Sequence, residues 1–131
     1  MRIFFDTNVL AAALVTRGLC AELFEVVLQS HKLLISGAVI KELERILPEK
    51  LGQSESVTQG FITLLRSEAD LVTSEGAPPP LPDPDDAPII AAALAGKSDI
   101  FVTGDKALLE LKSIEGMPVI TPRVLWEMLA G

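Results

Sequence analysis

The stretch DPDDAPIIAAALAGKSDIFVTGD, residues 83–105, decides how this chain is organised. Its first residues have the composition of a linker. A segment rich in prolines and acidic residues cannot bury enough apolar surface to fold. An apolar run with helical spacing follows at once, and then a short apolar segment typical of a buried strand. We therefore expect a helix over residues 86–95 and a strand over 99–103. Only residues 76–82 keep the linker interpretation, as a stiff and exposed connection.

The same alternation of short apolar strands and helical patterns continues through the rest of the 131 residues. Further strands are expected at residues 2–5, 32–36, 69–73 and 118–121. Further helices are expected at residues 8–14, 19–29, 36–47, 57–67, 105–111 and 122–129. This alternation is typical of an α/β fold around a mostly parallel sheet. We find no repeat and no convincing boundary, so we expect a single domain over residues 1–131.

Composition excludes several functional classes. The single Cys20 forms no internal disulfide and suits a reducing cytoplasm, and the single His31 excludes histidine-rich zinc sites. No apolar run is long enough to span a membrane, and no secretion signal is recognisable. The formal net charge is −7, and residues 51–86 hold seven acidic residues against one basic residue. Bulk electrostatics therefore opposes nucleic-acid binding, which would need a cation or a local basic rim.

Carboxylates must then carry most of any catalysis, and two of them follow predicted strands directly. Asp6 follows the strand at residues 2–5, and Asp105 follows the strand at 99–103. Ligands of open parallel sheets bind outside the carboxyl ends of the strands, so neighbouring strands would bring both side chains into one crevice. The alternative is that each aspartate only caps the helix that follows it.

Glu42 borders the apolar stripe of its predicted helix, where an unpaired carboxylate is costly. A salt bridge with Lys41 or Arg45 is an equally good explanation of this position. Its presence beside the two aspartates would nevertheless add a third carboxylate to the crevice.

Three aspartates, Asp83, Asp85 and Asp86, precede the apolar helix. The helix dipole explains one or two acidic residues in a first turn better than three. Pro84 suits the first helical position after an Asp83 cap. Pro88 disfavours helical geometry at Ala87, which leaves open whether Asp85 or Asp86 faces the crevice.

Four converging carboxylates without histidine form an all-oxygen site that suits Mg²⁺ or Mn²⁺. Without a cation they would repel one another. The usual work of one or two such ions is phosphodiester hydrolysis.

Over its whole length the chain resembles the PIN-domain family, and most closely the VapC-like toxins of bacterial toxin–antitoxin pairs. The matching blocks are FFDTNVLAAAL (4–14), LLISGAVIKELERIL (33–47), the stretch 83–105 and VITPRVLWEML (119–129). The resemblance implies a three-layer α/β/α fold with a parallel sheet of strand order 3-2-1-4-5. It also implies a Mg²⁺- or Mn²⁺-dependent endoribonuclease that is the toxin of a type II pair, with an antitoxin partner and a homodimeric state, whereas the expected cytoplasmic location comes from the single cysteine.

Matched position by position, the family's catalytic and metal-binding carboxylates fall on Asp6, Glu42, Asp86 and Asp105. Its supporting polar residues fall on Asn8, Ser36 and Thr103. Asp83 and Asp85 have no firm counterpart and would cap the helix or support a second metal ion. Four cations are candidates for contacts with flanking phosphates, although exposed charges often serve solubility alone: Arg17, Lys41, Lys106 and Arg123.

Two other functions fit parts of the sequence. A haloacid-dehalogenase-like phosphatase also has a strand that ends in aspartate, but that family requires a second aspartate where this chain has Asn8. A PIN fold that binds RNA or protein without cutting would not need all four carboxylates, and this chain has few aromatic residues on which bases could stack.

Overall fold

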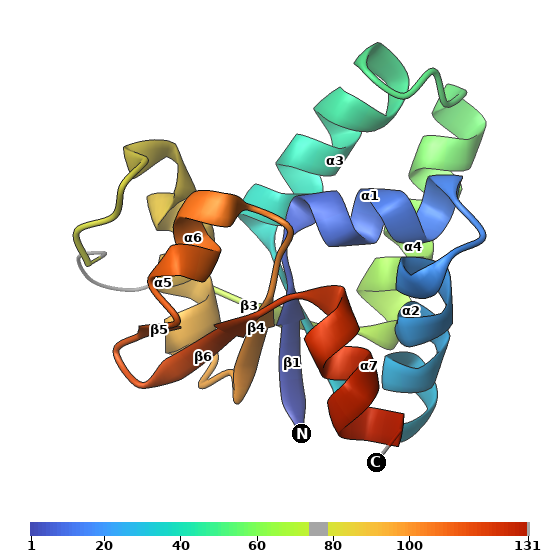
Figure 1. Cartoon of the computed structure of the whole chain (residues 1–131). Coiled ribbons are helices and arrows are strands. Elements are labelled where there is room, and N and C mark those ends of the chain that lie inside the picture. Colours follow the sequence, from blue (N-terminus) through green and yellow to red (C-terminus); the bar gives the residue numbers. More distant parts are fainter. Residues whose placement is uncertain (74–78, 131) are drawn as a thin grey trace.

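The computed structural model describes residues 1–73 and 79–130, which form a sheet with helices on both faces (Figure 1). The strands are β1 (Arg2–Phe5), β2 (Lys32–Ser36), β3 (Asp70–Val72), β4 (Ile100–Val102), β5 (Ser113–Ile114) and β6 (Met117–Ile120). The helices are α1 (Thr7–Val15), α2 (Leu19–Ser30), α3 (Gly37–Glu49), α4 (Glu55–Glu68), the short 3-10 turn η1 (Pro84–Asp86), α5 (Ala87–Ala95), α6 (Lys106–Glu110) and α7 (Pro122–Ala130).

The sheet has the order β3-β2-β1-β4-β6-β5, and all neighbours are parallel except β5 and β6. The five predicted strands therefore stand in the predicted order, which confirms the α/β architecture. The two-residue strand β5 was not expected. It forms because Glu115 and Gly116 both have positive φ, 48° and 84°, which is the geometry of a tight hairpin turn.

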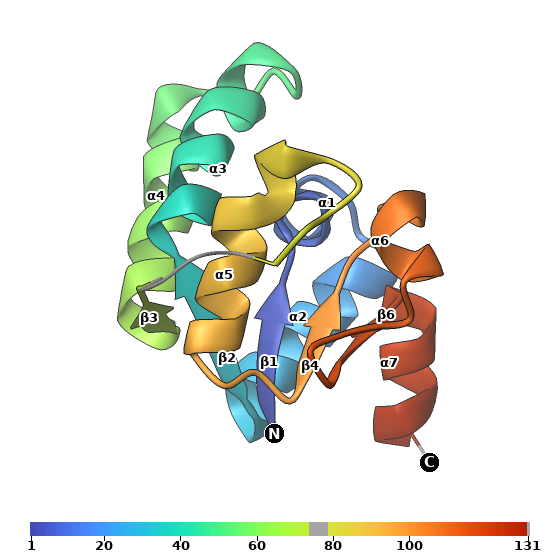
Figure 2. The same cartoon turned by 90° about the vertical axis from the view of Figure 1, so that its left-hand side faces the viewer.

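The strands are apolar because both faces of the sheet are covered. Figure 2 shows α5 in front of the sheet and α2 behind it. Ile3, Phe4 and Phe5 of the central strand β1 are completely buried. The ring of Phe4 stacks on that of Phe101 in β4 with 5.5 Å between centroids, which adds a side-chain contact to the backbone pairing of β1 and β4.

The helices lie where the sequence predicts them, with one correction at the start of α5. The region predicted as one helix from residue 86 begins as η1, whose first position is Pro84, and continues as α5 from Ala87. Ala87 is helical, with φ −58° and ψ −44°, so the expectation that Pro88 would disfavour this geometry is wrong. Pro88 is tolerated because the first amides of a helix have no partner within it. The predicted connection at 76–82 lies partly outside the described residues, since 76–78 are not among them.

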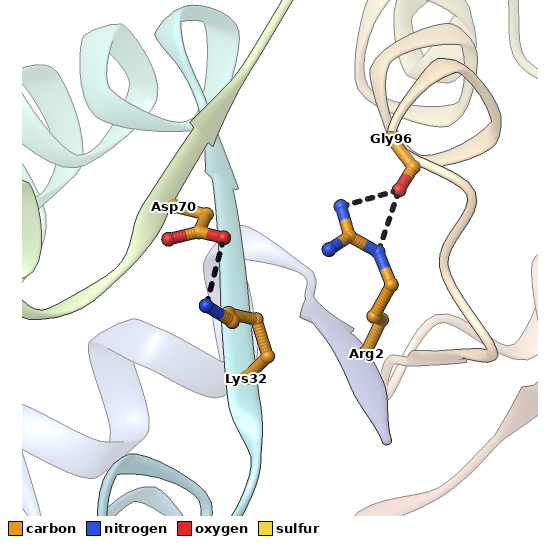
Figure 3. Close-up of polar contacts among 4 residues, drawn as sticks. All are labelled: Arg2, Lys32, Asp70 and Gly96. Carbon is orange, nitrogen blue, oxygen red and sulfur yellow. Dashed lines mark hydrogen bonds and ion pairs between the residues drawn. The ribbon is translucent and has the colours of Figure 1, made fainter.

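The amino ends of the strands are held by polar contacts (Figure 3). The guanidinium of Arg2 donates two hydrogen bonds, of 3.0 and 2.7 Å, to the carbonyl of Gly96 at the end of α5. Lys32 of β2 pairs with Asp70 of β3 at 3.5 Å. These contacts lie at the end of the sheet opposite to the predicted crevice. None of the helices in the described residues has the length and apolar composition needed to cross a membrane.

Candidate active site

Asp6 and Thr103 meet at the carboxyl ends of β1 and β4, which are paired side by side. Asp6 is 8% exposed, and its Oδ2 accepts a 2.7 Å hydrogen bond from the hydroxyl of Thr103. Its Oδ1 accepts the N–H of Thr7 at 2.8 Å. The adjacency of these two strands was the condition for a common crevice, and it is fulfilled.

Asp105 is tied to the same place through Thr103, whose hydroxyl oxygen accepts the N–H of Asp105 at 3.0 Å. Oδ1 of Asp105 caps α6 by accepting the amides of Ala107 and Leu108 at 2.8 and 3.2 Å. Asn8 contributes from α1, where its Oδ1 accepts the N–H of Gly104 at 3.4 Å. Asp6 and Asp105 therefore both cap the helices that follow them, and both are also bound to Thr103 at the carboxyl end of β4.

Glu42 lies half-buried in α3. The start of this helix is fixed by buried Ser36, whose hydroxyl oxygen accepts the N–H of Val39 at 3.3 Å. Within the described residues the single ion pair is that of Lys32 and Asp70, so no salt bridge joins Glu42 to Lys41 or Arg45. The ion-pair interpretation of Glu42 is thus not observed.

The surroundings of Asp86 contain the charges of the other predicted site carboxylates. Its pKa is raised from 3.8 to about 6, first by burial and then by the negative charges of Asp105, Asp6, Asp83 and Glu42. Such repulsion requires the charges to be close, because solvent screens distant ones. The four carboxylates predicted for the site thus share one electrostatic environment, although they come from four separate parts of the sequence.

The pKa of Asp6 is also raised, mainly by burial. The hydrogen bonds from Thr103 and Thr7 oppose this effect, whereas the charges of Glu42 and Asp105 add to it. Asp6 is therefore a carboxylate whose ionised form depends on its hydrogen-bond donors and on any positive charge brought to the crevice.

Asp85 and Asp86, which the sequence left unresolved, lie in different surroundings. Asp85 is exposed, and its N–H donates to Oδ1 of Asp83 at 2.9 Å. The charge of Asp85 is not among those that raise the pKa of Asp86 or Asp6. The geometry therefore favours Asp86 as the member of the cluster and Asp83 as the cap of η1.

The donor set fits a hard divalent cation, with one qualification. All candidate ligands are carboxylate oxygens, and each hydrogen-bonded oxygen of Asp6 retains a lone pair for a metal. Yet in the part of the chain that is described, no three Asp, Glu, His or Cys side chains stand close enough to share an ion. The pKa of Asp86 nevertheless shows that the charges of Asp105, Asp6 and Glu42 act on it, as a shared cation site would require.

A cavity of about 370 Å³ at the carboxyl ends of β2 and β3 had no signal in the sequence. Its described lining comes from β2, α3, the end of β3 and α5, and consists of Ser36, Gly37, Ala38, Lys41, Val72, Thr73, Pro88 and Ala92. Small residues scattered over distant segments form no pattern that periodicity or motif spacing would reveal.

Comparison with known proteins agrees with this geometry. The family model of the PIN domain matches residues 2–107. No curated protein matches the chain. Among solved structures, the fold is similar to a chain in the crystal structure of VapBC2 from Rickettsia felis, which is bound to a DNA fragment from the promoter of VapBC2. The two chains are 15% identical, and the TM-score is 0.64 over 92% of this chain and 98% of that one. It is also similar to the PIN domain endonuclease Utp24, with 20% identity and a TM-score of 0.56 over 92% of this chain and 84% of that one. The family match over most of the length, on a fold shared with these structures, establishes that this chain belongs to the PIN domain family.

Proposed function

We propose that this protein is a Mg²⁺- or Mn²⁺-dependent endoribonuclease that hydrolyses RNA phosphodiester bonds. The observation that carries the proposal is the junction of β1 and β4, where the Thr103 hydroxyl binds both the carboxylate of Asp6 and the N–H of Asp105. The charges of both aspartates also raise the pKa of Asp86, after the larger effect of burial. A carboxylate whose pKa is perturbed by burial and by neighbouring charges is a candidate for a functional site. Membership of a family that includes the endonuclease Utp24 supports nuclease chemistry.

Each side chain has a distinct part in this proposal. Asp6, Asp86 and Asp105 hold the cation, and Glu42 completes its surroundings directly or through water. Thr103 keeps the Asp6 carboxylate oriented and favours its ionised form. In such sites the cation activates water and neutralises charge at the phosphodiester in its transition state. Hydrolysis would leave a 5′-phosphate and a 3′-hydroxyl.

The biological role that fits best is the toxin of a type II toxin–antitoxin pair, acting as a homodimer with an antitoxin as its partner. The sequence blocks that resemble VapC-like toxins support this role, and so does the fold shared with VapBC2. Co-expression with the product of an adjacent small gene tests it: relief of growth arrest and co-purification are expected of an antitoxin. Growth that the chain alone leaves unaffected would contradict the toxin role.

The enzymatic proposal is tested by incubating the purified chain with mixed RNAs in Mn²⁺. Cleavage is expected with Mn²⁺, none with EDTA, and none with Asp6→Asn. Cleavage that persists in Asp6→Asn would indicate a contaminating nuclease or a different site. RNA that binds but stays intact would favour the non-cleaving module, and turnover of para-nitrophenyl phosphate without RNA cleavage would favour a phosphatase.

A further inference from the structure

Within the described residues, no side chain fills the cavity at the carboxyl ends of β2 and β3. It has a volume of about 370 Å³, which falls within the range of small-molecule sites, about 300–1,000 Å³. A Cβ built on Gly37 would meet no atom within 4 Å, so a larger residue there would enter open space. Gly37 begins α3, and Ala92 faces the same cavity from α5. Side chains this small leave room that a ligand can occupy.

None of the four proposed catalytic carboxylates is among the described lining residues, but the cavity is lined by α3, which carries Glu42, and by α5, which begins directly after Asp86. Lys41 precedes Glu42 in α3, and Pro88 lies two residues after Asp86 at the start of α5. Figure 2 shows α3 and α5 side by side at the carboxyl end of β2. A polymer with one phosphate at the carboxylates would therefore place an adjoining unit in the cavity.

The charge of the cavity differs from that of the cluster. Lys41 is the one charged residue of its described lining, and no ion pair within the described residues engages it. Ser36 and Thr73 add hydroxyl groups, whereas Val72 and Pro88 offer apolar surface. A cation, hydroxyls and a small apolar wall together suit a phosphate, a sugar and a base.

We propose that this cavity, which we call the Lys41 cavity, binds the nucleotide that adjoins the scissile phosphate, with the Lys41 ammonium on its phosphate. This inference rests on the proposed ribonuclease function and adds a substrate subsite to it. Of the four cations considered for flanking phosphates, Arg17, Lys41, Lys106 and Arg123, only Lys41 lines this cavity. In a chain of net charge −7, a local cation is what an RNA strand needs beside an acidic centre.

The first test measures binding without cleavage. Fluorescence anisotropy with a short labelled single-stranded RNA is recorded over a range of salt concentrations, with every variant in the Asp6→Asn background. Loss of one phosphate contact should make the slope of log affinity against log salt shallower by about 0.7 in Lys41→Ala. Lys41→Arg should retain the slope. Arg66→Ala on α4 is the matched control, since it removes an exposed positive charge elsewhere. A slope that Lys41→Ala shares with Arg66→Ala would overturn the proposal.

The second test fills the cavity in the catalytically intact chain. Gly37→Leu should raise KM for RNA by about tenfold or more, the equivalent of about 1.4 kcal/mol of binding. Its thermal stability should stay at or above that of the unmodified chain, because leucine is the better helix former. Gly60→Leu in α4 is the control, since a Cβ there also meets no neighbour within 4 Å. An unchanged KM in a folded Gly37→Leu would also overturn the proposal.

The two tests separate this inference from the proposed function. If the chain cuts RNA and the variants at Lys41 and Gly37 behave like their controls, the Lys41 cavity is not a subsite and the ribonuclease function stands. If the chain does not cut RNA but the salt slope depends on Lys41, the cavity binds nucleotides and the ribonuclease function fails.

Discussion

The hydroxyl of Thr103 donates a 2.7 Å hydrogen bond to Oδ2 of Asp6, and this bond joins the carboxyl ends of two adjacent parallel strands. The oxygen of the same hydroxyl accepts the N–H of Asp105 at 3.0 Å. One buried side chain therefore sets the positions of two carboxylates that lie 99 residues apart in the sequence. It also lowers the pKa of Asp6 against the opposing effect of burial.

Thr103→Val should lower kcat/KM for RNA cleavage by about tenfold to a hundredfold, because the charged Asp6 loses a hydrogen bond of about 1.5–3 kcal/mol. The pKa of Asp6 should rise further, so the acid limb of the pH–rate profile should move to higher pH. Thr103→Ser retains the hydroxyl and should restore both quantities. A pH–rate profile that Thr103→Val leaves in place would show that the hydroxyl does not act on Asp6.

Thr58→Val is the matched substitution at a threonine without such a role. Thr58 in α4 is 2% exposed, and its hydroxyl has no hydrogen-bond partner within the described residues. Replacing an unsatisfied buried hydroxyl by a methyl group of similar size should stabilise the fold by about 1 kcal/mol. Urea denaturation measures the change, and RNA cleavage should be unaffected. A destabilised Thr58→Val would mean that the hydroxyl has a partner in solution.

The relation between sequence and site differs from residue to residue. Asp6 and Asp105 could be placed from sequence, because each directly follows an apolar strand and parallel strands end at a common edge. Asp86 could not be separated from Asp85, since the direction of a side chain after Pro84 depends on a 3-10 turn that leaves no periodic pattern. Strand β5 was not predicted because two residues are too few to show an alternation of polar and apolar side chains. Its only signal in the sequence was the turn at Glu115 and Gly116.

Stability in the absence of metal should depend on pH through Asp86. Its pKa is 3.8 ordinarily and about 6 in the fold, so between these values the folded chain binds more protons than the unfolded chain. The free energy of unfolding therefore falls as pH rises across this window. Asp86→Asn should remove that fall and stabilise the fold at neutral pH by about 1 kcal/mol, a value reduced for solvent screening because Asp86 is only partly buried. Thermal melts in EDTA across this pH range measure the effect.

Asp85→Asn is the control for this comparison, since Asp85 is exposed and its charge does not raise the pKa of Asp86. Its melting temperature should follow that of the unmodified chain at every pH. If Asp85→Asn removed the pH dependence and Asp86→Asn preserved it, the assignment of the two aspartates would be reversed.

Divalent cations should stabilise the fold through the same carboxylates. A ligand at one hundred times its dissociation constant raises the free energy of unfolding by about 2.7 kcal/mol. Mg²⁺ or Mn²⁺ should therefore raise the melting temperature of the unmodified chain, and chelation should reverse the rise. Asp6→Asn should lose most of this response. A response of equal size in Asp6→Asn would show that the cation binds elsewhere.

Gly96 should tolerate no side chain, because α5 ends against the edge strand β3. A Cβ at Gly96 would lie 2.8 Å from Cγ1 and 3.1 Å from Cβ of Val72. The φ of Gly96 is −76°, so glycine is required by this close approach and not by backbone geometry. Gly96→Ala should lower the free energy of unfolding by about 1–3 kcal/mol, the usual cost of overpacking. Urea denaturation of Gly96→Ala, Val72→Ala and the double variant should show coupling, because the smaller residue 72 relieves the clash. Gly60→Ala is the control: its added Cβ meets open space, so this change should stabilise α4 by about 0.5–1 kcal/mol. If the effects of Gly96→Ala and Val72→Ala were additive in their double variant, α5 would have to shift away from β3 to accept the methyl group.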